Sequence, residues 1–293
     1  MHVFVTGGSG FIGSAVVPEL LGAGHTVTGL ARSDAAAARL EEAGASVLRG
    51  DLADLDALQR GAAGADGTVH LGFVHDFANF AAAGATDATA ITAMAEALEG
   101  TGKALVTASG VLGLPSGRVV TERDVPAQAH RATALAFASR GVRAVEVRLS
   151  PSVHGAGDHG FVPALIGIAR ERGTSAYVGD GSGTWPAVHR ADAARLFRLA
   201  VESAPAGSVL HGAAEEGVPT RTIAETIGRH LGLEVTPVAP GEEAQQHFGW
   251  IGPFFSLDVR ASHALTSELL GWEPTHPGLL ADLDEGSYFA SRG

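Results

Sequence analysis

Three glycines near the start of the chain follow a short apolar run and open a stretch with helical spacing. The segment Thr6–Gly13 reads Thr-Gly-Gly-Ser-Gly-Phe-Ile-Gly. In this pattern Gly7 permits a tight turn, Gly10 lets the backbone approach a pyrophosphate, and Gly13 allows close packing of helix on strand. The start of the following helix offers free N–H groups and the positive end of a dipole to phosphates. The pattern predicts a nicotinamide dinucleotide site made by Thr6, Gly7, Gly10, Phe11, Ile12 and Gly13.

Apolar runs and helix-like segments alternate through the first half of the chain. After the first run, further strands are expected at residues 25–30, 46–48, 67–71, 104–107 and 143–148. Helices are expected at residues 11–21, 35–43, 54–63, 87–98 and 130–139. Repeated βα units give a parallel sheet covered by helices on both faces. We therefore predict an α/β fold in which residues 1–150 form a Rossmann-type, doubly wound, NAD(P)-binding domain.

The alternation loosens after Pro151. Helices are expected at residues 161–172, 191–202 and 220–231, the last capped by Thr220, and strands at residues 176–178 and 208–211. The tail from Val235 onward is rich in Pro, Gly and aromatic residues. We expect residues 151–293 to form mostly a smaller C-terminal substrate-binding lobe, with some elements returning to the Rossmann sheet.

Charge and composition narrow the classes of partner. The formal net charge of −12 disfavours nucleic acids and anionic membranes, because both would repel the chain. The chain has no cysteine, which excludes disulfides, thiolate zinc sites and cysteine nucleophiles. We expect no signal peptide, because the N-terminus leads straight into the first strand. The chain has no 18-residue apolar run and no His-x-His or His-x-x-x-His spacing, so no membrane span and no metal site are expected. We expect a cytoplasmic monomer or homodimer that binds a small-molecule substrate.

The end of the second predicted strand bears on the choice between NADP and NAD. NAD-binding proteins place an acidic residue about 20 residues past the glycines, where it binds the ribose 2′-hydroxyl. Here Ala31 supplies no carboxylate, whereas Arg32 and Ser33 can bind a 2′-phosphate through charge-assisted hydrogen bonds. The alternative is that Arg32 is a surface residue and Asp34 contacts the ribose. We expect NADP as the cofactor, with NAD as the alternative.

Further short motifs follow the glycine loop along nearly the whole chain. They are Gly-Asp-Leu at 50–52, Val-His-Leu-Gly at 69–72, Val-Arg-Leu-Ser-Pro-Ser-Val-His-Gly at 147–155, Val-His-Arg-Ala-Asp at 188–192 and Leu-Gly-Trp at 270–272. Together they resemble extended short-chain dehydrogenases/reductases of the NAD-dependent epimerase/dehydratase type. The resemblance implies that Asp51 and Leu52 border the adenine. It also implies that Leu71 and the loop with Ser150, Pro151 and Val153 lie beside the cofactor, the loop facing the nicotinamide.

The chain lacks the acid–base pair that is typical of that family. The family places Tyr-x-x-x-Lys on the helix before the sixth strand, which would fall near Val125 and Ala129. The chain has a single lysine, Lys103, and neither Tyr177 nor Tyr288 is followed by a lysine four residues later. The resemblance is therefore to an atypical member, and the usual tyrosine mechanism is ruled out.

Other polar residues are candidates for the acid–base role of the absent Tyr-Lys pair. By the resemblance, Ser109 lies near the family serine after the fifth strand and can donate a hydrogen bond to substrate. His75 and His154 each follow a predicted strand at the carboxyl edge of the sheet, where ligands bind, and histidine can both give and take a proton near neutral pH. We predict Ser109, His75 and His154 as catalytic residues. The alternative is that some of the 13 histidines fall near the cleft by chance.

Four further residues are predicted to contact substrate. Asp76 follows His75, and Tyr177, Trp185 and His189 come from the expected lobe, where aromatic residues can line a pocket. For His189 the alternative is a structural hydrogen-bond cluster with Asp192. We also expect His70, on the fourth strand, to be buried.

The leading hypothesis is an NADP-dependent oxidoreductase that acts on a small carbonyl, hydroxyl or imine compound. One alternative is an epimerase, dehydratase or isomerase that holds NAD(P) tightly and returns it unchanged. Another is a non-catalytic NADP-binding regulator, which the missing Tyr-Lys pair makes credible. Net consumption of NADPH separates the first hypothesis from the other two.

Overall fold

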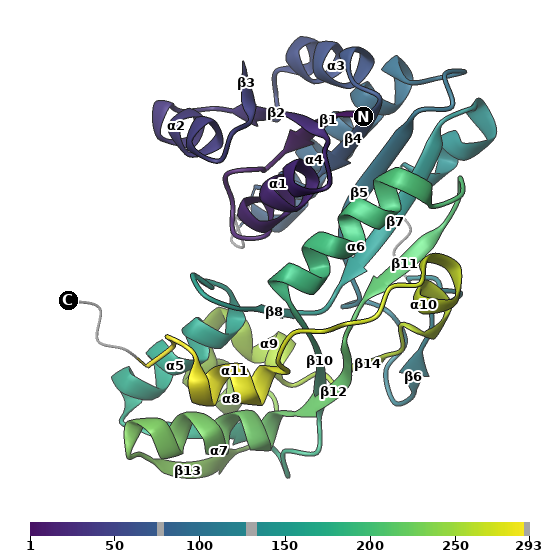
Figure 1. Cartoon of the computed structure of the whole chain (residues 1–293). Coiled ribbons are helices and arrows are strands. Elements are labelled where there is room, and N and C mark those ends of the chain that lie inside the picture. Colours follow the sequence, from purple (N-terminus) through teal and green to yellow (C-terminus); the bar gives the residue numbers. More distant parts are fainter. Residues whose placement is uncertain (75–78, 127–133, 290–293) are drawn as a thin grey trace.

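A computed structural model describes residues 1–74, 79–126 and 134–289 of the chain (Figure 1). Seven strands form the main sheet, in the order β11-β7-β5-β4-β1-β2-β3, and every neighbouring pair in it is parallel. The strands are β1 (His2–Thr6), β2 (Thr26–Ala31), β3 (Ser46–Arg49), β4 (Gly67–His70), β5 (Ala104–Gly110), β7 (Arg143–Leu149) and β11 (Val209–Gly212). The predicted Rossmann-type α/β fold is confirmed. The strand order reverses between β1 and β4, the point at which such sheets bind ligands at their carboxyl edge.

Helices bury both faces of this sheet, as a parallel sheet requires. One face carries α1 (Gly13–Gly22), α2 (Asp34–Glu42) and α6 (Arg190–Ser203), and the other carries α3 (Leu55–Gly64), α4 (Phe80–Ala97) and the 3-10 helix η3 (Leu135–Arg140). Side chains alternate along each strand, so that Val3 and Val5 of β1 join the first core while Phe4 joins the second. The unbroken apolar runs of the sequence follow from this two-sided burial.

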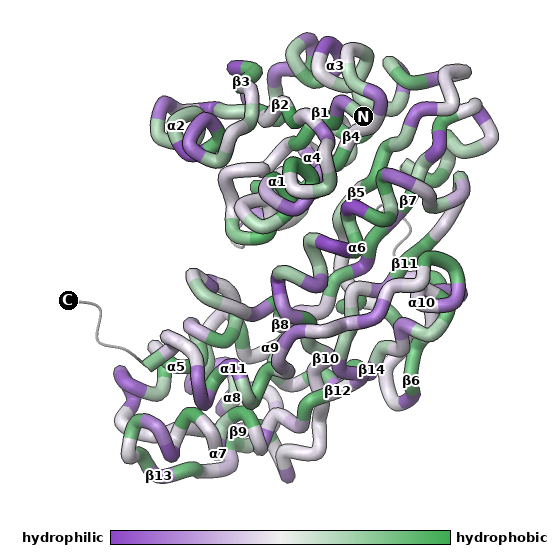
Figure 2. The backbone as a smooth tube through the Cα atoms, in the orientation of Figure 1, coloured by the Kyte–Doolittle hydropathy of each residue, from purple (hydrophilic) through white to green (hydrophobic). Residues whose placement is uncertain are grey.

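The second half of the chain builds a lobe below the carboxyl edge of the sheet (Figure 1). Its strands are β8 (Ser152–His154), β10 (Thr184–His189) and β12 (Glu215–Pro219) in one sheet, and β9 (Thr174–Val178) paired with β13 (Glu234–Val238). Its helices are α5 (Phe161–Arg172), α7 (Thr220–Leu231), α8 (Glu242–Phe248), η4 (Gly249–Ile251), α9 (Gly252–Phe255) and α11 (Leu279–Glu285). The lobe has its own apolar core, and Figure 2 shows apolar segments in both the main sheet and the lobe.

Two smaller elements join the halves of the chain. The short strand β6 (Val119–Val120) pairs with β14 (Arg260–Ala261), and α10 (Ala264–Leu270) packs beside β11. β11 itself comes from the second half but forms the edge of the main sheet through its pairing with β7. Residues distant in sequence therefore meet at the carboxyl ends of β5, β7 and β11.

Several predicted boundaries differ from the structure. β5 continues to Gly110, so that Ser109 lies within the strand and not after it. The predicted cap Thr220 is wrong: Thr220 is the first residue of α7, Pro219 precedes it as the cap residue, and the Thr220 amide donates to the carbonyl of Gly183. The strand β10 was not expected. Of the predicted helix at 130–139, the described part is the 3-10 helix η3. No helix among the described residues is both long and apolar enough to cross a membrane.

Candidate cofactor and active site

The glycine loop closes tightly against the end of β4. Gly7 has φ +68°, and a Cβ on it would lie 2.6 Å from the amide nitrogen of Gly72. A Cβ on Gly13 would lie 2.1 Å from the carbonyl oxygen of Gly7. The amide of Gly10 donates to that same carbonyl at 3.0 Å. A side chain at Gly7 or Gly13 would therefore clash with the backbone and distort the loop. The loop leads into the N-terminus of α1, whose free amides can bind an anion.

A buried chain of hydrogen bonds fixes this loop to the sheet. Thr6 Oγ1 accepts from the amide of Gly72 at 3.1 Å and lies 2.7 Å from Nδ1 of His70. Nε2 of His70 lies 3.0 Å from Oδ1 of Asp87 on α4. His70 thus connects Thr6 on β1 to Asp87 on α4 through its two ring nitrogens. His70 is 2% exposed, so the predicted burial of this histidine is confirmed.

The carboxyl ends of β2 and β3 place two arginines together. Arg32 is exposed and directly follows Ala31, which is the register partner of Arg49. Arg49 donates to Asp34 at 2.7 Å, and both of these side chains are mostly exposed. The Ser33 hydroxyl oxygen accepts from the amide of Ala36 and so caps α2, which leaves its hydrogen free to donate. This corner offers arginine cations and a hydroxyl, and the carboxylate of Asp34 is paired with Arg49.

A surface hollow lies between the loop after β3 and helix α4. Its volume is about 290 Å³, and it is lined by Leu52, Ala53, Leu55, Ala85, Thr86 and Thr89. The Asp51 carboxylate accepts from the amides of Ala53 and Asp54 at 2.8 and 3.1 Å, which shapes the turn that presents Leu52. The Leu52 side chain also packs near Gly72, which the glycine loop contacts at Gly7: a Cβ on Gly72 would lie 2.9 Å from Leu52. The hollow and the glycine loop therefore adjoin, as one extended dinucleotide requires.

A polar cluster lies at the carboxyl ends of β5 and β7. Ser109 Oγ donates to Oε1 of Glu146 at 2.6 Å, and Arg148 donates to Oε2 of Glu146 at 3.2 Å. Arg148 also donates to the carbonyl of Asp124 at 2.7 Å. Ser109 and Arg148 are register partners, and alternate residues of a strand share a face, so all three side chains lie on the α3/α4 side of the sheet. Glu146 and Arg148 are 2% and 4% exposed, whereas Ser109 is partly open.

Two further buried groups border this cluster. His211 is the β11 register partner of Arg148, and its Nδ1 lies 2.9 Å from the carbonyl of Ser262. Glu122 accepts from both the amide and the hydroxyl of Thr266 at 2.7 Å. Burial lowers the pKa of His211. Nε of Arg148, Nε2 of His211 and Oε2 of Glu122 are buried and have no hydrogen-bond partner among the described residues.

The loop after β7 is held by buried hydrogen bonds. The amide and the hydroxyl of Ser150 both donate to the carbonyl of Gly212, at 3.1 and 3.0 Å. His154, at the end of β8, is fully buried, and its Nδ1 lies 2.8 Å from Oδ2 of Asp282 on α11. Its Nε2 has no partner among the described residues. His154 thus forms a His–Asp pair inside the protein, with no exposed surface that a substrate could reach.

His189 takes part in a structural network, as the alternative interpretation proposed. Its Nδ1 accepts from the amide of Ala191 and so caps α6, and its ring stacks on His276 at 4.7 Å. The buried Asp192 accepts from the amide and Nδ1 of His276, each at 3.0 Å. Burial lowers the pKa of His189, so this cap is neutral at neutral pH.

The C-terminal segment is tied to the loop after β8. The Tyr288 hydroxyl donates to Oδ2 of Asp158 at 2.9 Å and accepts from the amide of Gly155 at 3.0 Å. Burial raises the pKa of both Tyr288 and Asp158. These contacts hold residues 155–160 next to the glycine loop, where the His159 ring packs at 5.7 Å from the ring of Phe11.

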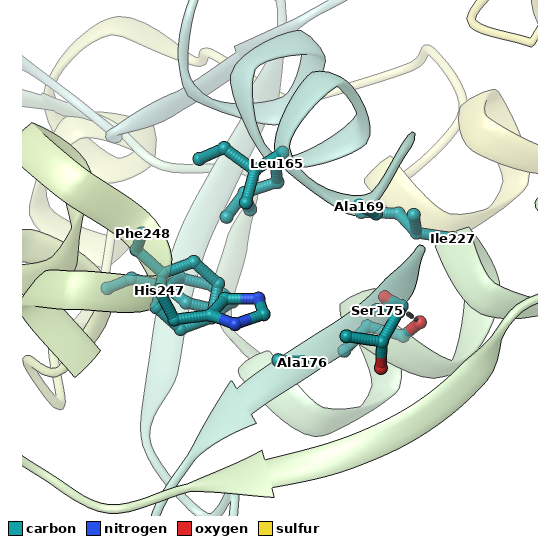
Figure 3. Close-up of a pocket in the computed structure, with 11 residues that line it drawn as sticks. Leu165, Ala169, Ser175, Ala176, Ile227, His247 and Phe248 are labelled. Atoms are coloured by element: carbon teal, nitrogen blue, oxygen red, sulfur yellow. Dashed lines mark hydrogen bonds between the residues drawn. The ribbon is translucent and has the colours of Figure 1, made fainter. Parts of the chain in front are cut away.

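Tyr177 and Trp185 are core residues of the lobe. Trp185 is fully buried and donates from Nε1 to the carbonyl of Phe254 at 3.2 Å, so it has no exposed surface with which to contact a substrate. Tyr177 is 9% exposed, with Arg221 over its ring. An internal cavity of about 10 Å³ lies among α5, β9 and α7 near His247, enough for about one water and not for a substrate (Figure 3). The predicted residues His75 and Asp76 lie outside the described residues.

Known proteins with similar sequences agree with this architecture. The model of the NAD dependent epimerase/dehydratase family matches residues 3–124. A 2-alkyl-3-oxoalkanoate reductase of Stenotrophomonas maltophilia is 30% identical, over 73% of this chain and 69% of its own. The chain belongs to the NAD-dependent epimerase/dehydratase family. Another relative, an uncharacterized protein of Schizosaccharomyces pombe, is 49% identical over 99% of this chain and 100% of its own.

A solved structure shares the fold over nearly the whole chain. A dTDP-glucose 4,6-dehydratase from Streptomyces venezuelae, with NAD bound, superposes with a TM-score of 0.76 and 21% identity over 97% of this chain and 96% of its own. At that identity the likeness concerns the fold alone.

The buried pair Glu146–Arg148 is the part of the site that sequence reasoning missed. A signal was present: the seventh strand reads Arg-Ala-Val-Glu-Val-Arg-Leu, in which two charged residues alternate with valines inside an apolar strand. Charges at such positions are rarely buried unless they are paired. The single lysine, Lys103, precedes β5 and donates to the carbonyl of Ala63, at the opposite edge of the sheet from the glycine loop.

Proposed function

We propose that the protein is an NADP(H)-dependent oxidoreductase that acts on a small carbonyl, hydroxyl or imine compound. The observation that carries the proposal is the Ser109 hydroxyl, which Glu146 holds at the carboxyl end of β5. β5 is the neighbour of β4, and the glycine loop packs on the end of β4. A reactive hydroxyl and a dinucleotide loop thus share one edge of the sheet.

The residues present suit a nicotinamide dinucleotide. Gly7 and Gly13 allow the tight loop, and Gly10 lets its backbone approach a diphosphate. The hollow beside Leu52 can take the adenine. Arg32, which is exposed directly after β2, supplies the positive charge that a 2′-phosphate requires, which favours NADP over NAD. When bound, NADPH supplies a hydride.

Ser109 and Glu146 provide a route for the proton. In the oxidation direction the Ser109 oxygen takes the proton of the substrate hydroxyl while its own proton passes to Oε1 of Glu146, 2.6 Å away. In the reduction direction the proton returns by the same two atoms to the substrate oxygen. Arg148 holds the second oxygen of Glu146, which fixes the carboxylate toward Ser109. This pair performs the proton transfer that a Tyr-Lys pair would otherwise perform.

Relatives support a reductase among the activities of the family. The Stenotrophomonas maltophilia relative is named for the reduction of 2-alkyl-3-oxoalkanoates. A relative from Stigmatella aurantiaca, 29% identical over 71% of this chain and 67% of its own, is named a ketoreductase. Small 3-oxo compounds are therefore the first substrates to test.

The decisive experiment measures NADPH oxidation by the purified protein with a panel of small ketones, aldehydes, imines and 3-oxo acids. Stoichiometric loss of NADPH with formation of the reduced product is expected for at least one compound. Conversion of a substrate with no net change in NADPH would instead indicate an isomerase or dehydratase. NADPH binding without conversion of any compound would indicate a regulator.

A further inference from the structure

Arg190 lies at the junction between the lobe and the glycine loop. It is the first residue of α6, and the carbon of its guanidinium lies 5.3 Å from the centre of the Phe11 ring. Phe11 belongs to the loop whose backbone opens α1. The lobe thus brings one cation to the loop that binds the diphosphate in the proposed function.

The charge of Arg190 has no counter-charge among the residues that the structure describes. Some arginine side chains form no hydrogen bond or ion pair with any other described residue, namely Arg32, Arg39, Arg60, Arg123, Arg170 and Arg190. The first five of these are exposed, so water solvates them. Within the described part of the chain, Arg190 alone is both partly buried and unpaired. Partial burial of an unpaired charge is unfavourable, and a bound anion would relieve it.

The surroundings of Arg190 hold its side chain in place. A Cβ on Gly155 would lie 3.2 Å from Cγ of Arg190, so this glycine makes room for the arginine stem. A Cβ on Gly157 would lie 3.9 Å from Nη1. The preceding residue, His189, is fixed by its hydrogen bond to the amide of Ala191. The guanidinium is therefore held over Phe11 by its own backbone and by the loop beneath it.

We propose that Arg190 binds the diphosphate of the cofactor from the side of the lobe, facing the amides of the glycine loop. The inference rests on the proposed function and adds a residue of the lobe to its cofactor site. A guanidinium can donate two parallel hydrogen bonds to phosphate oxygens. The amides at the start of α1 approach the diphosphate from the sheet, and Arg190 approaches it from the lobe. The bound diphosphate thereby joins the two parts of the molecule.

Calorimetric titration with ADP-ribose and with adenosine 5′-monophosphate tests this inference without any reaction. The variants are Arg190→Leu, Arg190→Lys and, as a control with the same loss of charge, Arg170→Leu on the exposed face of α5. We expect Arg190→Leu to lower the affinity for ADP-ribose, NADH and NADPH alike by about tenfold or more, because charged hydrogen bonds are lost. The affinity for adenosine monophosphate should fall by less than about threefold. The affinity of Arg190→Lys for ADP-ribose should lie between that of the unaltered protein and that of Arg190→Leu. The affinity of Arg170→Leu should equal that of the unaltered protein.

The outcomes separate this inference from the proposed function. Equal binding of ADP-ribose by the unaltered protein and by a folded Arg190→Leu variant would show that Arg190 does not hold the diphosphate, while leaving the cofactor proposal intact. Selective loss of NADPH alone would assign Arg190 to the 2′-phosphate and overturn the inference. If the unaltered protein binds none of the four nucleotides, both proposals are wrong. Thermal unfolding of each variant verifies that it is folded.

Discussion

The hydroxyl of Ser109 donates a 2.6 Å hydrogen bond to the buried carboxylate of Glu146, across the boundary between β5 and β7. Glu146 is in turn paired with Arg148, two residues later on the same strand. A hydroxyl that touches solvent is thus connected to an acid that does not. This arrangement suits a proton relay, because the acid is shielded from water while the hydroxyl can meet a substrate.

The first prediction concerns the carboxylate itself. Glu146→Gln keeps the size of the side chain but removes the proton acceptor, so turnover should fall by about 10²- to 10⁴-fold, the usual range for general acid–base catalysis. Affinity for NADPH should stay within about threefold, because Glu146 does not face the glycine loop. Steady-state rates and a binding titration check both statements.

A double substitution separates this chemical role from a structural one. Glu146→Gln alone leaves the buried Arg148 without its counter-charge and should destabilise the fold by about 3–5 kcal/mol. Adding Arg148→Met should recover much of that stability, because an uncharged pair can pack in the same space. Turnover should not recover. A double variant that regains activity together with stability would show that Glu146 is only structural.

The second prediction concerns the choice of cofactor. Arg32→Ala should make the binding free energy of NADPH less favourable by about 1–3 kcal/mol, because charged hydrogen bonds are lost, and should leave the affinity for NADH unchanged. Arg60→Ala, which removes an equally exposed charge from α3, is the control and should alter neither affinity. Equal affinities of the unaltered protein for NADH and NADPH would contradict the assignment of Arg32 to a 2′-phosphate.

The third prediction concerns the glycine loop. Gly7→Ala forces a side chain into a left-handed conformation and against the backbone of Gly72, so it should cost at least about 1–3 kcal/mol of stability and abolish cofactor binding. Gly22→Ala is the matched control. Gly22 lies at the end of α1 with nothing within 4 Å of an added Cβ, and alanine there should stabilise by about 0.5–1 kcal/mol. Denaturant unfolding measures both changes.

The fourth prediction concerns pH. Burial lowers the pKa of His189, His211 and His247 in the folded protein, so each binds a proton more readily in the unfolded chain. The free energy of unfolding should therefore fall as the pH drops below about 6.5, by up to about 1.4 kcal/mol per pH unit for each histidine. His211→Gln should make this fall shallower. Urea unfolding between pH 5 and pH 8 tests it, and a stability that rises toward acid in this range would refute it.

The glycine loop and the parallel, doubly wound sheet were predictable from sequence because local patterns indicate them. Gly7, Gly10 and Gly13 are near neighbours in the chain, and the alternation of strands and helices leads directly to a parallel sheet. The orientation of single side chains was not predictable in this way. His154 and Trp185 lie in the strands β8 and β10, and they contact Asp282 and Phe254, which are more than 60 residues away in the chain.

Long-range pairing also explains what sequence reasoning missed. β10 pairs with β8 and β12, which lie about 30 residues before and after it in the chain. The importance of Glu146 and Arg148 depends on β5, β7 and β11 lying side by side, which brings Ser109 and His211 to the same cluster. A charged residue within an apolar strand was the one available signal. It identifies a buried pair but not the hydroxyl that the pair holds.

Transfer of deuterium from 4-deuterated NADPH to product tests the central claim most directly. The panel of small carbonyl and imine compounds is incubated with the protein and with each of the two C4 stereoisomers of the labelled cofactor. Mass spectrometry then measures the deuterium in the products. We predict that one isomer delivers one deuterium to each molecule of reduced product, and that Ser109→Ala and Glu146→Gln slow this delivery. Products that carry no deuterium while the cofactor is returned unchanged, or a cofactor that binds and never reacts, would contradict the assignment as an oxidoreductase.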